Sequence, residues 1–309
     1  MLSYLENLTL RLAAGASKLD EPTRQRHALW LTDQQRDDGG FAGREGDSDP
    51  YYSAFALRSL LVLDALTEPI ATRATEFLRS RLSQQESIVD LISLLFAAAI
   101  CELGAGQSVI GDDDVTWAKN VATLLESLRT DDGGFAKSPE GRAGSTYQTF
   151  LSTLCLELLG QKPADVESVI GFLHRQAHPD GGFLEIRAAK RPGVNPTAAA
   201  IGTLKTLERL GDFDPQQTID FVAEMQTGEG GLTANTRIPF EDLLSTCTGL
   251  ITLVDLDAAD ALDHKAAMRY ARTMEQPTGG FTGFALDHTA DVEYTFYGIA
   301  TLALCAGLE

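Results

Sequence analysis

Gly181-Gly182-Phe183 returns 49 residues later as Gly230-Gly231-Leu232, and after another 49 as Gly279-Gly280-Phe281. The same period separates three threonines that follow these glycine pairs, Thr197, Thr246 and Thr295. A period this long and this regular indicates a chain built from repeated supersecondary units. The glycines supply the backbone conformations that end a helix and reverse the chain, and the apolar residue after them can pack back onto the helices.

Two earlier glycine pairs extend the pattern toward the N-terminus, in Asp132-Gly133-Gly134-Phe135 and Asp38-Gly39-Gly40-Phe41. The 94 residues between them are close to two periods, so one repeat has lost its glycine turn, which we expect near Ile88. Five glycine turns and one lost turn give six units of about 48 residues. These units account for nearly all 309 positions, and we predict a single domain over residues 1–309.

The bulk composition is typical of a soluble globular protein, with 44% hydrophobic and 22% charged residues. A net charge of -19 argues against a nucleic-acid partner, because binding a phosphate backbone requires clustered Lys and Arg. Four cysteines lie in apolar segments without the spacing of a zinc site, and we expect them to be reduced core thiols. They are Cys101, Cys155, Cys247 and Cys305.

Neither a signal peptide nor a membrane span is indicated by the sequence. Glu6 and Arg11 interrupt the apolar residues of the first segment, which also lacks a basic start. The longest apolar stretch, 88–101, contains Asp90 and is shorter than the ~20 residues that a membrane helix needs. We therefore expect a cytoplasmic protein.

Each repeat predicts two helices of different character. The first has apolar residues at helical spacing among polar ones, which indicates an outer helix with one exposed face; these segments are 72–82, 115–128, 164–176, 215–225 and 264–274. The second carries almost no charge, which indicates an inner helix buried on all sides; these segments are 145–159, 196–210, 243–253 and 291–305. An open solenoid needs polar end repeats, yet the last inner helix is as apolar as the others. We therefore predict an all-α (α/α)6 toroid, a closed barrel of six helical hairpins.

A glutamine precedes several of the glycine turns. Gln35 stands four residues before Gly39 and Gln226 four before Gly230, while Gln176 and Gln276 occupy nearby positions and Arg129 replaces the glutamine of the third copy. This pattern resembles the repeat shared by protein prenyltransferase β subunits and squalene or terpene cyclases. The resemblance covers essentially the whole chain, and it implies a toroid with a central apolar cavity that holds an isoprenoid.

The segment 291–302 is most similar to the last repeat of a geranylgeranyltransferase β subunit. The resemblance places the three catalytic zinc ligands at Tyr294, Glu241 and Leu243, of which only the glutamate is a metal ligand of the expected kind. The family's diphosphate-binding Arg, Lys and Tyr fall on Asn235, Ile238 and Leu244. We therefore expect no zinc and no other cofactor, apart from Mg²⁺ if the substrate is a diphosphate. The resemblance also implies a helical partner subunit.

Basic residues follow four of the five glycine turns and offer replacement contacts to a diphosphate. The candidates are Arg44, Lys137, Arg142, Arg187, Lys190, Arg191 and Arg237. The loops should open on the same rim of the ring, where these charges could converge. The alternative is that they are ordinary solvated loop charges.

Aromatic residues on the inner helices form the second group of candidates. Aromatic faces stabilise a carbocation and equally suit a plain prenyl chain. The candidates are Tyr51, Tyr52, Phe55, Tyr147, Phe150, Tyr294, Phe296 and Tyr297, while Ala198, Ala199 and Ala200 leave room for a ligand. The alternative for each ring is packing in the core.

Carboxylates at the starts of inner helices suggest a cyclase. Asp291-Val-Glu293-Tyr294-Thr295 resembles the Asp-x-Asp-Asp-Thr motif of proton-initiated cyclases, with Glu293 in the place of the acid, and Asp49 stands in a poorer copy. Such an acid must be kept protonated by burial so that it can attack an alkene. Asp291 is alternatively a helix cap, as are the carboxylates of 112–114.

Three functions remain open from the sequence. The first is a protein similar to prenyltransferase β subunits that binds a prenyl diphosphate without the usual zinc ligands. The second is a terpene cyclase with Glu293 or Asp49 as proton donor, and the third is a non-catalytic isoprenoid-binding toroid.

Overall fold

The computed structural model describes residues 2–82, 88–111 and 115–308. The chain divides into two compact units. The middle unit comprises Met1–Leu5 and Asp113–Ala266, and the end unit comprises Glu6–Asp112 and Ala267–Glu309. Apart from its first five residues, the N-terminal part of the chain thus belongs to the same unit as the C-terminal part.

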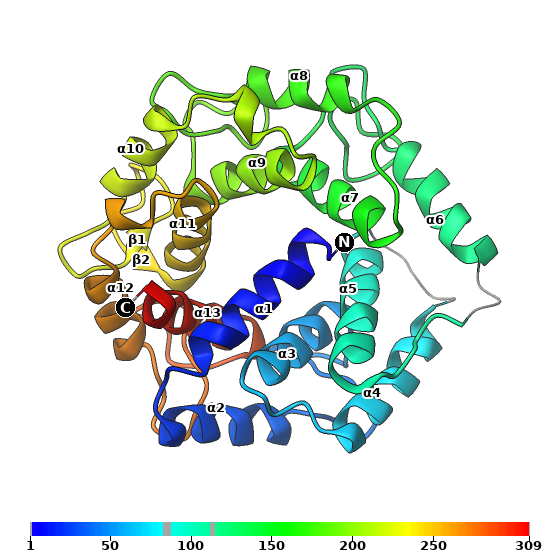
Figure 1. Cartoon of the computed structure of the whole chain (residues 1–309), viewed down its shortest axis with the longest axis vertical. Coiled ribbons are helices and arrows are strands. Elements are labelled where there is room, and N and C mark those ends of the chain that lie inside the picture. The colour runs from blue at the N-terminus through cyan, green and yellow to red at the C-terminus, as the bar shows by residue number, and fades with distance from the viewer. Residues whose placement is uncertain (1, 83–87, 112–114, 309) are drawn as a thin grey trace. The chain divides into compact units, whose positions relative to one another are not determined.

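The middle unit contains two layers of helices (Figure 1). The inner layer consists of α7 (Thr146–Leu158), α9 (Val194–Thr206) and α11 (Leu243–Asp255), with α9 packed between its two neighbours. The outer layer consists of α6 (Val115–Glu126), α8 (Val166–Gln176) and α10 (Gln216–Glu224). Short elements complete this unit: β1 (Leu232–Thr233), β2 (Glu241–Asp242), η2 (Leu210–Asp212) and η3 (Ala259–Ala261).

The end unit repeats the same arrangement (Figure 1). Its inner helices are α3 (Pro50–Val62), α5 (Ile88–Ala105) and α13 (Val292–Leu308), and α3 packs against both others. Its outer helices are α2 (Glu21–Asp33), α4 (Glu68–Arg81) and α12 (His264–Thr273), the last of which begins in the middle unit. Helix α1 (Tyr4–Ala16) also crosses the boundary and packs on α13, where Gly15 lies against the backbone of Ala303.

The outer and inner helices predicted from the sequence are therefore confirmed, with ends that differ by a few residues. The lost glycine turn is predicted near Ile88, next to residues 83–87, which lie outside the described part of the chain, as does the acidic segment 112–114. The four predicted core cysteines are buried, and none of them is joined in a disulfide within the described residues. Within the described residues, no helix has the length and apolar character needed to cross a membrane.

The first glycine of each pair is required by backbone geometry. Gly181 has a φ of +98°, and a Cβ at this position would lie 2.0 Å from the carbonyl oxygen of Gln217 on the next outer helix. A side chain would therefore be strained by its conformation and by contact with the neighbouring helix. The same positive φ occurs at Gly39, Gly133, Gly230 and Gly279.

The 49-residue spacing of the threonines has a structural cause. Phe183, which follows the glycine pair and is fully buried, donates its backbone N–H to Oγ1 of Thr197 over 2.9 Å. Thr197 in turn donates its hydroxyl to the carbonyl of Gly193, one turn back. The same bond joins the turn to the inner helix in four other repeats: Phe41 to Ser53, Phe135 to Thr149, Leu232 to Thr246, and Phe281 to Thr295.

Two of the motif glutamines tie their glycine turn to the start of the next outer helix. The side-chain amide of Gln226 donates to the carbonyls of Gly230 and Asp263, and its oxygen accepts from the backbone N–H of Asp263. Gln35 makes the corresponding bonds to Gly39 and Ile70. These glutamines therefore have a structural role.

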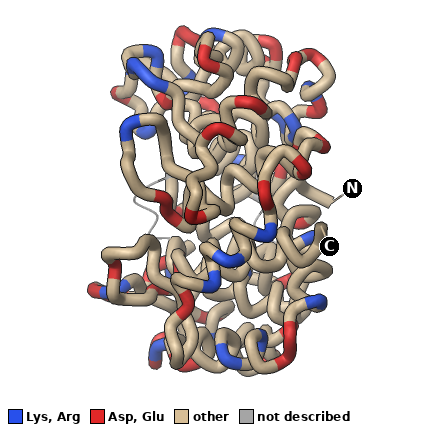
Figure 2. The backbone as a smooth tube through the Cα atoms, turned by 90° about the vertical axis from the view of Figure 1, so that its left-hand side faces the viewer, with Lys and Arg blue, Asp and Glu red and all other residues tan. Residues whose placement is uncertain are grey.

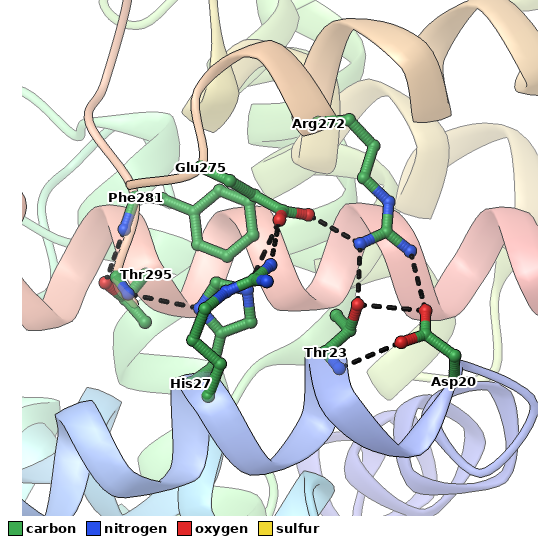
Figure 3. A network of polar contacts seen from close by, with 9 residues as sticks. Asp20, Thr23, His27, Arg272, Glu275, Phe281 and Thr295 are labelled. Atoms are coloured by element: carbon green, nitrogen blue, oxygen red, sulfur yellow. Dashed lines mark hydrogen bonds and ion pairs between the residues drawn. The ribbon is translucent and has the colours of Figure 1, made fainter. Parts of the chain in front are cut away.

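The last repeat meets the first within the end unit (Figure 3). Nδ1 of the buried His27 on α2 accepts the N–H of Gly280 over 3.1 Å, and the imidazole stacks on Phe281. Beside it, Arg272 on α12 donates to Glu275 and to the hydroxyl of Thr23 on α2. This contact between the first and last repeats is one that the predicted ring closure requires.

In the last turn, His27 binds a backbone N–H that two earlier turns bind with an aspartate of their own. The N–H of Gly40 is bound by Asp38 and that of Gly134 by Asp132, in each case the residue just before the glycine pair. Thr278 stands at this position in the last turn. A histidine from the first outer helix therefore completes the last turn.

Candidate functional site

Six aromatic side chains gather between α3 and α13 of the end unit, and we call them the aromatic cluster. Phe55 lies at its centre, with ring centroids 5.0 Å from Tyr51 and 5.5 Å from both Phe296 and Tyr297. Tyr52 packs against Tyr51, and Tyr294 against Tyr297. Phe296 is buried, whereas the other five rings are half-buried on helices whose side chains are mostly buried. The cluster therefore presents a partly accessible aromatic surface.

The carboxyl group of Glu293 lies beside this surface. Tyr51 donates its hydroxyl to Oε1 of Glu293 over 2.8 Å, which leaves Oε2 free of that bond. Burial raises the pKa of Glu293 above its usual range, and the negative charge of Asp291 raises it further, against the opposing effects of the Tyr51 hydrogen bond and Arg44. A carboxylic acid next to aromatic rings can donate a proton and have the resulting cation stabilised by the ring faces.

The two aspartates proposed with Glu293 both cap inner helices. Oδ1 of Asp291 accepts the N–H of Tyr294 at the start of α13, which confirms the capping alternative. Asp49 accepts the N–H of Tyr52 in the same way at the start of α3. Burial also raises the pKa of Asp49, although its bonds to backbone N–H groups oppose this. A carboxylate that holds a helix start is a poorer proton donor than one that does not, so the structure favours Glu293 over Asp49.

Arg44 is held by carboxylates of the last repeat. Its guanidinium donates to Asp287 over 2.9 Å and to Asp291 over 2.8 Å, and it lies 5.9 Å from the centre of the Tyr294 ring. A diphosphate would have to compete with both carboxylates for this cation. The sequence pattern contained no signal for Asp287, because it belongs to none of the repeated motifs.

The other basic candidates lie in the middle unit, on three loops that run from a glycine turn to an inner helix. Loop 136–145 is joined to loop 184–193 by the N–H of Thr146, which donates to the carbonyl of Glu185. Loop 184–193 is joined to loop 233–242 by the N–H of Val194, which donates to Ala234. These three adjoining loops carry six basic residues, all of them exposed: Lys137, Arg142, Arg187, Lys190, Arg191 and Arg237.

The remaining aromatic candidates also belong to the middle unit. Tyr147 is 42% exposed on α7, and Phe150, one turn later, is half-buried with its ring edge-on to Tyr4 of α1. They therefore lie on a different unit from the aromatic cluster.

The residues at the zinc positions of geranylgeranyltransferases do not fit a zinc site. Leu243 has no donor atom and is fully buried at the start of α11, while neighbouring Asp242 caps that helix by accepting the N–H of Ser245. Glu241 lies in β2, and Tyr294 belongs to the other unit. In the part of the chain that the structure describes, no three His, Cys, Asp or Glu side chains are grouped as metal ligands. We therefore propose no zinc-dependent chemistry, and the absence of zinc remains a prediction.

The sequence matches a model of the prenyltransferase alpha-alpha toroid domain over residues 3–184, 97–238 and 200–309. The chain belongs to this family. The all-α toroid predicted from the glycine repeat is thereby confirmed as the fold class. No curated protein sequence matches the chain significantly.

Solved structures of prenyltransferase-type toroids resemble this one along nearly their whole length. Candida albicans protein geranylgeranyltransferase-I complexed with GGPP is 16% identical with a TM-score of 0.70, covering 91% of this chain and 90% of that chain. The type II terpene cyclase MstE from Scytonema, in complex with geranylgeranyl dihydroxybenzoate, is 13% identical with a TM-score of 0.63, covering 98% and 99%.

An enzyme of different activity shares the same fold. The GH76A alpha-1,6-mannanase from Salegentibacter is 13% identical with a TM-score of 0.61, covering 93% of this chain and 99% of that chain. At these identities the likeness shows the fold alone, so function has to be argued from the site.

Proposed function

We propose that this toroid binds an isoprenoid against the aromatic cluster and cyclises it by protonating an alkene from Glu293. One observation carries the proposal: a half-buried glutamate of raised pKa, hydrogen-bonded by Tyr51, lies at a partly accessible aromatic surface. The fold shared with a terpene cyclase that is complexed with a geranylgeranyl substrate supports the same chemistry.

The reaction follows from the geometry of the carboxyl group. Tyr51 holds Oε1, so Oε2 carries the acidic proton and transfers it to a terminal alkene carbon. The alkene π electrons form the new C–H bond, and the adjacent carbon becomes a cation. A second alkene of the chain attacks this cation to form a C–C bond. The final cation then loses a proton to solvent, which gives a cyclic isomer of the substrate, and Glu293 takes up a proton from solvent.

Tyr51 and the aromatic rings have separate roles in this scheme. The Tyr51 hydroxyl stabilises the glutamate anion that remains after proton transfer. Phe55 and Tyr297 offer ring faces to the positive charge, an attraction worth about 0.5–2 kcal/mol per ring. The alkene carries no charge before it is protonated, so this route requires no metal ion.

Incubation with geranylgeraniol and geranylgeranyl diphosphate, followed by mass spectrometry, tests the proposal. We expect a cyclic product of unchanged mass, with the diphosphate retained where the substrate carries one, and undiminished formation in EDTA. Release of inorganic pyrophosphate in place of an isomer would contradict it.

A second candidate function is the binding of a prenyl diphosphate for transfer to an acceptor. The six exposed bases on adjoining loops of the middle unit favour it, as does the fold shared with a geranylgeranyltransferase-I complexed with GGPP. This function predicts pyrophosphate release with a suitable acceptor, dependence on Mg²⁺, and a helical subunit that co-purifies with the chain. Tight prenyl binding without turnover under either condition would instead identify a non-catalytic isoprenoid-binding toroid.

A further inference from the structure

The three adjoining loops of the middle unit, 136–145, 184–193 and 233–242, form what we call the cationic rim. Each loop ends at the first turn of an inner helix, so the rim lies at the N-terminal edge of α7, α9 and α11. Besides the backbone bonds described above, Arg191 donates to the hydroxyl of Thr236 and joins two of the loops through their side chains. The rim is thus one continuous edge within the unit.

The charge of the rim is opposite to that of the whole chain. Its exposed positions carry the six bases named above and one acid, Glu140, although the chain has a net charge of -19. The other acids of these loops are half-buried and two of them are engaged: Glu185 accepts from the hydroxyl of Ser145, and Asp242 caps α11. Figure 2 shows basic and acidic positions interspersed over most of the tube, with blue segments on loops at the upper left.

Two large apolar side chains project among these bases. Ile186 is 42% exposed and precedes Arg187, and Phe240 is 44% exposed on the same loop as Arg237. Isolated apolar side chains surrounded by Lys and Arg are typical of segments that lie at the surface of an anionic membrane. The core of a protein–protein interface is by contrast depleted of charge. The charge and the scattered apolar side chains therefore favour a lipid surface over a partner protein.

We propose that the cationic rim docks the protein on membranes that contain anionic phospholipids. The bases contact the headgroup phosphates, and Ile186 and Phe240 enter the boundary between headgroups and acyl chains. Isoprenoids dissolve in membranes, so docking at this edge would bring the toroid to its substrate. The docking itself does not depend on the proposed cyclisation, because it is measured without isoprenoid.

Flotation of the full-length protein with vesicles tests the proposal. Vesicles of phosphatidylcholine alone are compared with vesicles that also contain phosphatidylglycerol, at low and at high salt. We expect binding only to the anionic vesicles, and loss of binding at high salt because added ions screen charges at the surface.

Charge variants identify the surface that binds. Arg142→Gln, Arg187→Gln and Lys190→Gln together remove three bases of the rim while leaving the Arg191–Thr236 bond intact, and should lower the partition coefficient at least about tenfold. The matched control is Lys119→Gln, Lys162→Gln and Lys265→Gln, which removes the same charge from exposed positions outside the rim. Ile186→Ser with Phe240→Ser should weaken binding while the salt dependence persists. Circular dichroism checks that each variant folds.

Four results would overturn the proposal. One is equal loss of binding in the rim and control variants, and another is binding that does not depend on phosphatidylglycerol. The third is displacement from anionic vesicles by micromolar inorganic pyrophosphate, which would identify the rim as a site for free diphosphate. Recovery of an acidic protein on the rim with no vesicle binding would equally contradict it.

Discussion

Tyr51 on α3 and Glu293 on α13 are hydrogen-bonded over 2.8 Å although 242 residues separate them in the chain. The bond places an acid of raised pKa at the aromatic cluster and holds one of its oxygens. The two residues come from the first and last repeats, so the proposed proton donor exists only when these repeats meet.

Glu293→Gln should abolish cyclisation and leave isoprenoid binding intact. The amide has nearly the same shape but no acidic proton, so we expect the rate to fall by about 10²-fold or more, the scale of a lost general acid. Product formation is followed by mass spectrometry, and binding by quenching of tyrosine and tryptophan fluorescence. Glu241→Gln is the matched control, because Glu241 is half-buried in the middle unit and has no role in the proposed mechanism. Unchanged turnover in Glu293→Gln would remove Glu293 from the mechanism.

The pH dependence of the rate should report on Glu293. Only the protonated acid is active, so the rate falls as the pH rises through the pKa of Glu293, which burial holds above its usual range. The Tyr51 hydrogen bond stabilises the anion and lowers this pKa, so Tyr51→Phe should raise it and move the falling limb to higher pH. The measurement is the initial rate against pH for both proteins. A limb that moves to lower pH, or stays in place, would show that Tyr51 does not act on the acid.

Thr197→Val should destabilise the fold by about 1–3 kcal/mol, because it leaves the buried N–H of Phe183 without an acceptor. Thr203→Val is the control: Thr203 is equally buried, but its hydroxyl bonds only to the carbonyl of Ala199 in its own helix. Urea unfolding followed by circular dichroism compares the two. Equal losses of stability would mean that the turn is held by packing and not by this bond.

Gly181→Ala should cost more than about 2 kcal/mol, since the alanine meets both an unfavourable φ and the carbonyl of Gln217. Gly211→Ala makes the matched comparison, because a Cβ there meets no atom within 4 Å. Thermal unfolding midpoints are the readout. If the two variants had the same unfolding midpoint, the positive φ of Gly181 would not be a constraint on the turn.

Several contacts that connect the repeats could not be predicted from sequence. His27 completes a turn 253 residues away, and Arg44 pairs with Asp287 across 243 residues. The repeat period does not relate these residues to one another, because each contact occurs in one repeat only and is not part of the repeated motif. The basic loops differ in this respect, since their common place after the glycine turns was enough to predict that Arg187 and Arg237 would lie on adjoining loops.

The sequence by itself determined the repeat, the two kinds of helix and the turns between them. These features depend on local physics: helical spacing of apolar residues, and a φ that only glycine adopts without strain. Tertiary structure alone decided which side chains from different repeats meet. It bound Arg44 to Asp287 and Asp291, and it placed Glu293 with Tyr51 at the aromatic cluster. The pKa of an acid depends on such neighbours and on burial, which the order of residues does not specify.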